Sequence, residues 1–298
     1  MKKFFMTAAA VLAFLTASAQ FVTVESVTKL DGVLSEKAAI SPDGSFVVTN
    51  TANALKKVNI ADGSQTTIVD GAGLYNFAVS ADGSSVVYTR PSYNSKHLRY
   101  NALEAVNLDN GSVKTIVKAT RSLAHGYATT AGTVNAQEKG KVRSVALGNA
   151  KAVKAPFAAI NFGHLDVTVN GKTSTIDPQG RGSYIWASVN PAGTRVCYWL
   201  VGKGCFTCNL DGSDVRSHGK LRAAVWAGND MLVGQEEKNV QAQQLEASAI
   251  VALDVNTNET QKLTDDSVIA LYPSASADGK RVAFTTPTGE VYIINLRK

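Results

Sequence analysis

Ser41-Pro42-Asp43-Gly44 is the first copy of a phrase that recurs along this chain of 298 residues. The later copies are Ser80-Ala81-Asp82-Gly83, Asn190-Pro191-Ala192-Gly193 and Ser276-Ala277-Asp278-Gly279. Each copy stands between a short run of small residues and an alternating apolar segment. Asp and Asn hydrogen-bond their own backbone, and the closing Gly supplies the positive φ of a tight turn. The phrase therefore predicts a recurring β-hairpin.

A second turn follows each of the first two phrases, at Ala61-Asp62-Gly63 and Asp109-Asn110-Gly111. These turns join predicted strands 55–60 with 65–69 and 103–108 with 113–117. Four short strands in a repeat of about 40 residues are typical of one β-propeller blade. Since no such unit buries its apolar face alone, we predict an all-β ring of stacked blades.

The spacing of the phrases gives the number of blades. The phrases begin 39, 110 and 86 residues apart. The last interval holds two units, the hidden one with strands at 223–226 and 231–233. In the middle interval we expect one degenerate blade that begins near 127–130, carries an insertion at about 148–163 and ends at 165–176. This gives six blades, and two shorter blades in the same interval would give seven.

The two ends of the chain are predicted to close the ring. The last unit supplies only three strands, so its outer edge would be open to pairing with other chains. The alternating segment 21–27 belongs to no unit and is expected to complete that blade. Residues 20–298 would then form a single propeller domain.

The repeats resemble those of the TolB-type, WD40-like propeller family, in which Ser-Pro-Asp-Gly, an apolar strand, Asp-Gly and Leu-Thr follow in order. Leu263-Thr264 and Asp211-Gly212 also fit that order. The resemblance is to the propeller alone, without the N-terminal domain of TolB. It implies a scaffold that binds a protein or an envelope component, although this fold carries many functions.

The first residues are typical of a secretory signal peptide. Lys2 and Lys3 precede an apolar stretch at 4–16 and the small residues Ala17-Ser18-Ala19. We expect a signal peptide at 1–19, with a buried first helix as the alternative, and a periplasmic or secreted protein. No later segment reaches the roughly 20 apolar residues of a membrane span, so no transmembrane segment is predicted.

The charge balance is mildly basic, with a formal net charge of +6. This balance favours solubility or attraction to anionic envelope surfaces, and we find no nucleic-acid-binding module. The expected partner is therefore a protein or a glycan of the cell envelope, and the protein is expected to be a monomer without a cofactor.

Two long connections, 90–102 and 236–248, are predicted on the face opposite the phrases, at one mouth of the central channel. Long loops often carry function, although a tolerated insertion explains them equally well. Candidate ligand-binding residues in the first connection are Arg90, Tyr93, Lys96, His97, Arg99 and Tyr100. Aromatic residues of channel-lining strands are further candidates, with packing between blades as the alternative: Tyr184, Trp186, Trp226 and Tyr272.

Three cysteines leave three interpretations open. A two- or four-residue turn after position 200 would place Cys197 opposite Cys208, within reach of a disulfide in an exported protein. Three reduced packing cysteines are the second interpretation. The Cys205-Phe206-Thr207-Cys208 spacing resembles a metal or redox pair, but residues three apart on a strand point to opposite faces.

Catalytic motifs are absent from the sequence. The four histidines, His97, His125, His164 and His218, lack metal-binding spacing. The turn aspartates Asp43, Asp82 and Asp278 are expected to cap turns rather than bind calcium, which needs more oxygen ligands. We therefore predict a non-catalytic binding scaffold without a metal. The alternative is a glycan-binding or glycan-active protein, such as a lyase.

Overall fold

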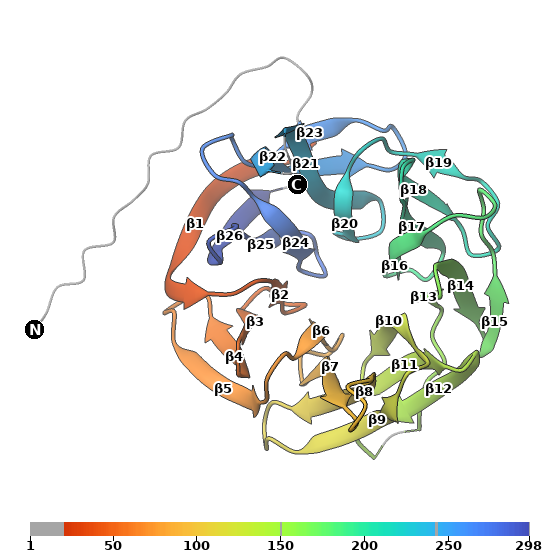
Figure 1. Ribbon diagram of the computed structural model, residues 1–298. Helices are drawn as coiled ribbons and strands as arrows, with labels where there is room; N and C mark the ends of the chain where they lie inside the picture. The colour runs from red at the N-terminus through yellow and green to blue at the C-terminus, as the bar shows by residue number, and fades with distance from the viewer. Residues whose placement is uncertain (1–20, 150, 242–243, 298) are drawn as a thin grey trace, which may run out of the picture.

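The computed structural model describes residues 21–149, 151–241 and 244–297. Within these ranges every regular element is a β-strand, and the strands form six sheets around a central axis (Figure 1). The predicted all-β, six-bladed propeller is therefore confirmed. The predicted signal peptide, residues 1–19, lies outside the described residues.

Five of the sheets have four strands each. The first blade contains β2 (Ala38–Ile40), β3 (Phe46–Thr51), β4 (Ala54–Asn59) and β5 (Gln65–Asp70). The second contains β6 (Tyr75–Val79), β7 (Ser85–Tyr93), β8 (Arg99–Asn107) and β9 (Val113–Thr120). After the third sheet come β16 (Tyr184–Val189), β17 (Arg195–Leu200), β18 (Gly204–Asn209) and β19 (Arg216–Ser217). The next blade has β20 (Arg222–Trp226), β21 (Met231–Gln241), β22 (Gln244–Asp254) and β23 (Thr260–Lys262).

The ring is closed by the N-terminal strand, as predicted. The last sheet contains β24 (Leu271–Ala275), β25 (Arg281–Thr285), β26 (Glu290–Arg297) and, at its edge, β1 (Thr23–Leu34). β1 runs antiparallel to β26, from Thr23 opposite Arg297 to Leu34 opposite Glu290. The edge of β26 that would otherwise be open is thereby paired.

The third sheet is a double one. It has six strands: β10 (Leu123–Thr130), β11 (Thr133–Glu138), β12 (Lys141–Ala146), β13 (Phe157–Asn161), β14 (His164–Val169) and β15 (Lys172–Thr175). β10 and β13 are joined through the antiparallel pair His125 and Ile160. Gly126 permits this approach, because a Cβ at this position would lie 2.5 Å from the carbonyl oxygen of Ala158.

The direction of β13 shows that this sheet counts as one blade and not two, which gives six blades in total. β13 follows Pro156, which lies beside Gly193 of a recurring turn. Two residues after its end comes Gly163, whose carbonyl accepts a hydrogen bond from the Tyr184 amide at the start of β16. β13 therefore runs opposite to β10 and corresponds to the second strand of a blade. The half formed by β13 to β15 has no first strand of its own. The predicted insertion at 148–163 thus contributes a core strand to the sheet.

The recurring phrase forms the expected hairpin turn. In the first copy, the Ser41 hydroxyl donates to Asp43 Oδ1 at 2.6 Å and accepts from the Phe46 amide at 3.1 Å. The same oxygen of Asp43 accepts from the Ser45 amide at 3.0 Å. These hydrogen bonds, that from Ser41 first, hold the pKa of Asp43 below its usual value. The turn aspartate therefore has the capping role that was predicted.

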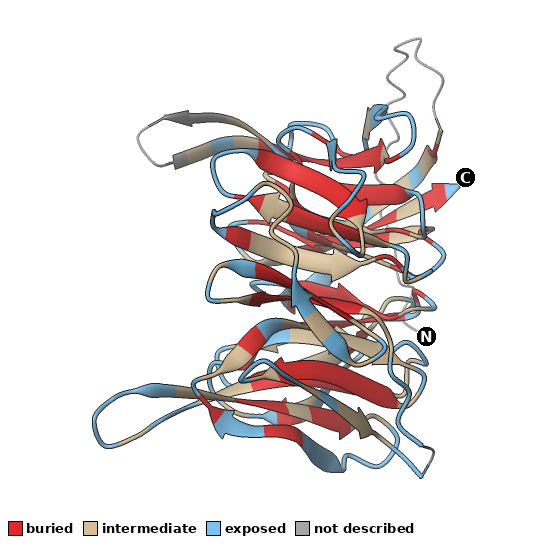
Figure 2. Cartoon of the chain, turned by 90° about the vertical axis from the view of Figure 1, so that its right-hand side faces the viewer, coloured by how far each residue is buried: buried red, intermediate tan, exposed pale blue. Residues whose placement is uncertain are grey.

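Two long hairpins project from one face of the ring, as Figure 2 shows. They are β7–β8 and β21–β22, so the two predicted long connections are mainly extended strands on the same face. We call this the hairpin face, and the face that bears the recurring turns the phrase face. Among the described residues, no helix is long and apolar enough to cross a membrane.

Candidate functional site at the channel mouth

The first strands carry a repeated irregularity at the hairpin face. β6, β10, β16, β20 and β24 each contain a bulge near their start, where the pairing with the second strand shifts. Four of the bulges hold a non-glycine residue at positive φ: Asn76, Trp186, Ala223 and Tyr272. Such a conformation costs an L-residue about 1–2 kcal/mol. A bulge re-aims side chains, so the repeat shapes the mouth of the channel.

An aromatic and charged cluster lies where β16 and β17 meet the next blade. The rings of Trp186 and Trp199 are tilted, with centroids 6.0 Å apart. The Arg222 guanidinium lies 5.5 Å from the Trp186 centroid and 5.9 Å from that of Trp199. Its Nη1 donates to Glu237 Oε2 at 2.6 Å. Two aromatic rings and an ion pair are thus held together by strands of two blades.

A buried glutamine extends this cluster to the last blade. The Gln235 side chain donates to Glu237 Oε1 at 2.8 Å and accepts from the Tyr272 amide at 2.8 Å. The Tyr272 ring in turn lies 4.6 Å below the Lys37 ammonium, which comes from the start of the first blade. A continuous chain of contacts therefore runs around this part of the mouth.

The second blade adds a further pair of a cation and a ring. The Arg99 guanidinium lies 4.7 Å from the centroid of Tyr75. Nearby, Arg90 Nε and the Tyr88 hydroxyl both donate to Glu104 Oε2, at 2.9 and 2.8 Å. Burial, followed by the hydrogen bond to Glu104, raises the pKa of Tyr88 to about 12. Arg90 is thus held in place by the blade, whereas Arg99 faces the ring of Tyr75.

The remaining candidates fall into two groups. Tyr184 is fully buried, and its hydroxyl donates to the carbonyl of Gly180, so it is a packing residue. The Trp226 indole donates to the carbonyl of Ser188 at 3.3 Å and joins two blades. The other candidates lie on the exposed β7–β8 hairpin: Tyr93, Lys96, His97 and Tyr100. The exposure of each side chain distinguishes the candidates that can contact a ligand from those that pack between blades. Sequence alone did not make this distinction.

Most of the exposed large apolar side chains that the structure describes lie on the hairpin face. Phe162, at the tip of the β13–β14 turn, is 87% exposed and Tyr93 is 63% exposed. Others on this face are Leu34, Leu98, Val201 and Tyr272, whereas Val113, Val153 and Val215 lie on the phrase face. Sequence reasoning missed Phe162 and Val201. The signal was an apolar residue next to glycine in a short turn, where a polar residue is usual.

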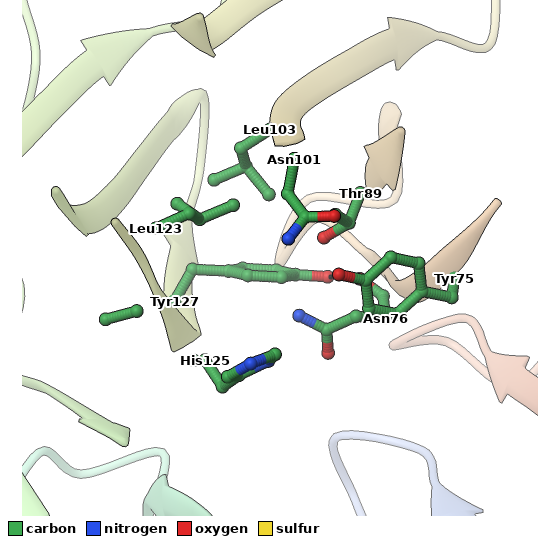
Figure 3. A pocket seen from close by; sticks show the side chains of 10 residues that line it. Tyr75, Asn76, Thr89, Asn101, Leu103, Leu123, His125 and Tyr127 are labelled. Atoms are coloured by element: carbon green, nitrogen blue, oxygen red, sulfur yellow. Dashed lines mark hydrogen bonds between the residues drawn. The ribbon is translucent and has the colours of Figure 1, made fainter. Parts of the chain in front are cut away.

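A small cavity lies between the second and third sheets, where the Tyr127 side chain connects them. It is lined by residues of both sheets, and Figure 3 shows Tyr75, Asn76, Thr89 and Asn101 near the hydroxyl end of Tyr127. That hydroxyl donates to the Asn76 carbonyl at 2.9 Å. The cavity volume is about 10 Å³, which leaves room for about one water molecule.

Cys197 and Cys208, which the first of the three interpretations joined in a disulfide, are not brought together. The turn after Leu200 has three residues, so Cys197 lies opposite Thr207 and Cys208 opposite Val196. Cys197 and Cys208 therefore point to opposite faces of the sheet and pack in different apolar clusters. All three cysteines are buried and free. Cys205, on the same face as Cys197, has its Sγ 3.9 Å from that of Cys197.

The histidines are separate from one another. His218 is buried between Thr207 Oγ1, at 2.9 Å, and Asn258 Oδ1, at 2.7 Å. His164 Nδ1 lies 2.5 Å from Asp177 Oδ2 near the surface. His97 lies on the β7–β8 hairpin, and His125 lines the small cavity. In the described part of the chain, no three or more His, Cys, Asp or Glu side chains are placed to hold a metal ion.

Solved structures resemble this chain in fold, whereas comparisons of its sequence find no match. No protein-family model matches the chain, and no curated protein matches it in sequence. Among solved structures, one described as TolB from Agrobacterium tumefaciens has a TM-score of 0.54 at 13% identity, over 91% of this chain and 97% of that one. A chain of the mitotic checkpoint complex has a TM-score of 0.60 at 10% identity, over 99% and 98%.

TolB from Acinetobacter baumannii has a TM-score of 0.53 at 11% identity, over 87% of this chain. The fold is that of the TolB propellers. The chain spans 62% of the length of the Acinetobacter protein. Sequence identities of 11–13% show a shared fold and nothing more. The predicted resemblance to the TolB-type propeller is therefore confirmed for the fold. Function has to be argued from the site.

Proposed function

We propose that this chain is an exported, non-catalytic binding protein whose hairpin face holds a protein of the cell envelope. In this proposal residues 20–298 form a monomeric domain in the periplasm or outside the cell. The observation that carries it is that the hairpin face holds six of the nine exposed large apolar side chains that the structure describes, together with the Trp186–Arg222 cluster. An excess of exposed apolar and aromatic side chains on one face favours an interface there.

The residue types favour a protein partner. Trp, Tyr and Arg dominate the binding energy of protein interfaces, mainly from positions near the centre of the contact. Trp186, Tyr272 and Arg222 are fixed by a bulge, a buried glutamine and an ion pair before any partner arrives. Side chains that are already ordered lose less entropy on binding.

A glycan is the alternative ligand, because the same aromatic rings would stack on sugars. The position of Phe162 and Val201 argues for the protein. Both lie in turns of neighbouring sheets, between β13 and β14 and between β17 and β18, and 87% and 54% of their surfaces are exposed. A wide protein surface reaches such turns, whereas a sugar chain in the mouth does not. Glycan-array binding together with no protein capture would favour the alternative.

The test compares variants of the two faces. Tyr93→Ser, Phe162→Ser and Val201→Ser are combined in one protein, and Val113→Ser with Val215→Ser in a control. Each protein is immobilised and exposed to an envelope extract of the native organism, and bound proteins are identified by mass spectrometry. We expect one protein to be retained by the wild type and the control and lost by the hairpin-face variant. Equal loss from both variants would refute the assignment of the face.

A further inference from the structure

A hollow opens on the hairpin face at the seam between the first and last blades. Its volume is about 630 Å³, which lies within the range of small-molecule sites. The walls come from the β1–β2 connection, the β3–β4 turn, β24 and the β25–β26 turn. The lining residues include Leu34, Glu36, Lys37, Leu271, Tyr272 and Pro287. We call it the seam hollow.

The seam hollow contains one ammonium group without a counter-ion. Lys37 Nζ lies 4.6 Å from the centroid of the Tyr272 ring. Among the residues that the structure describes, it has this ring contact and neither a hydrogen bond nor an ion pair. The Lys37 side chain is exposed to solvent. Partial desolvation by the surrounding residues lowers the pKa of Lys37, and the charge of Glu36 opposes this effect. An anion that enters the seam hollow would therefore meet an ammonium that contacts a ring but no carboxylate of the described residues.

The ring beneath the ammonium is held in an uncommon conformation. Tyr272 has φ 51°, which bulky residues rarely adopt. Its amide donates to the buried Gln235 side chain at 2.8 Å, which fixes the bulge from below. Strained residues that the surrounding structure maintains are concentrated at ligand sites. Tyr272 shares this conformation with Asn76, Trp186 and Ala223 of other blades, and here the supported bulge places the ring beneath the Lys37 ammonium.

We propose that the seam hollow binds a small monocarboxylate with an apolar body. The carboxylate pairs with the Lys37 ammonium, and the body lies against Leu34, Leu271 and Pro287. A single negative charge fits better than a phosphate group, because Lys37 is the one cation among the described lining residues and Glu36 lies beside it. This site goes beyond the proposed function and does not depend on a protein partner.

The test uses hexanoate and 3-phenylpropanoate as probes, with hexanamide and 3-phenylpropanamide as neutral counterparts. Binding to the mature protein is followed by ¹H–¹⁵N NMR titration. A charge-assisted contact contributes roughly tenfold to hundredfold in affinity. We expect each acid to bind at least tenfold more tightly than its amide, with shifts confined to residues around the seam hollow.

Lys37→Met is expected to lose this preference. Lys57→Met is the matched control, because Lys57 also lies over a ring, 4.5 Å from the centroid of Phe46, but outside the seam hollow. Amides that bind as tightly as the acids to the wild type would overturn the proposal. So would a folded Lys37→Met protein with unchanged affinity, or no shifts at millimolar acid. The acid–amide comparison needs only the wild type, so it decides even if a variant fails to fold.

Discussion

His218 shows how one side chain joins two blades of this propeller. It follows β19 in the fourth blade, where it bonds Thr207 of β18, and it also bonds Asn258 in the turn between β22 and β23 of the fifth blade. Burial lowers the pKa of His218, and the nearby charges of Arg195 and Arg216 act in the same direction, while the hydrogen bond to Asn258 opposes them. The folded protein therefore keeps this ring neutral.

This buried histidine predicts a loss of stability in acid. Above pH about 6.5, the ordinary pKa of histidine, both the folded and the unfolded chain hold a neutral ring. Below this pH, the unfolded chain binds a proton more readily than the folded chain does. The free energy of unfolding therefore decreases as the pH is lowered. We expect the melting temperature of the wild type, relative to that of His218→Gln, to decrease as the pH falls from 7.5 to 5. Parallel curves would contradict this assignment.

Tyr127 predicts a second effect of a single hydroxyl group. This hydroxyl donates to the carbonyl of Asn76, in the neighbouring blade, and burial raises the pKa of Tyr127. Tyr127→Phe removes the donor and keeps the ring, which should cost about 1 kcal/mol of unfolding free energy. Urea denaturation measures the change. An unchanged midpoint would show that the hydroxyl does not help to hold the two blades together.

The recurring turn makes a prediction that distinguishes two equivalent glycines. Gly44 and Gly83 have φ 72° and 73°, so alanine is strained at both, by about 1 kcal/mol. At Gly44 a Cβ would also lie 2.8 Å from Cδ of Arg281, whose Nη1 donates to the Gly44 carbonyl. At Gly83 nothing lies within 4 Å. Gly44→Ala should therefore lower the urea midpoint more than Gly83→Ala, and the reverse order would refute this explanation.

The sequence predicted those elements whose signals are local. The turn phrases and the degenerate unit around Met231 carry their own turn residues, and β1 was assigned because the segment 21–27 had no partner in its own repeat. The register of β17 and β18 was not predictable in this way. Val201-Gly202-Lys203-Gly204 is compatible with turns of two, three or four residues, and the three-residue turn moves Cys208 away from Cys197.

Features that depend on contacts between distant parts of the chain could not be predicted from the sequence either. The direction of β13 depends on its pairing with β10 and on the space that Gly126 leaves, and nothing within the segment 148–163 encodes this. The same holds for the site. The long hairpins and the aromatic residues were visible in the sequence. The contact of Arg222 with Trp186 depends on how successive blades pack, and that of Lys37 with Tyr272 joins the first blade to the last.

The ring as a whole depends on the pairing of its ends. β1 covers the edge of β26, and Leu30 and Val33 pack with Val47 of the first blade and Val291 of the last. Deletion of residues 21–34 would remove this pairing and leave a strand edge open. We expect the truncated protein to lose its cooperative thermal transition or to associate, as followed by circular dichroism and size-exclusion chromatography. A monomer with the wild-type melting temperature would contradict closure by β1.

Photo-crosslinking in the native cell tests the proposed role of the hairpin face most directly. The photoreactive residue p-benzoylphenylalanine replaces Phe162 on the hairpin face in one protein and Val215 on the phrase face in another, and adducts are identified by mass spectrometry. The proposal predicts one defined protein adduct from position 162 and none from position 215. An adduct from position 215 alone, or none from either position, would contradict it.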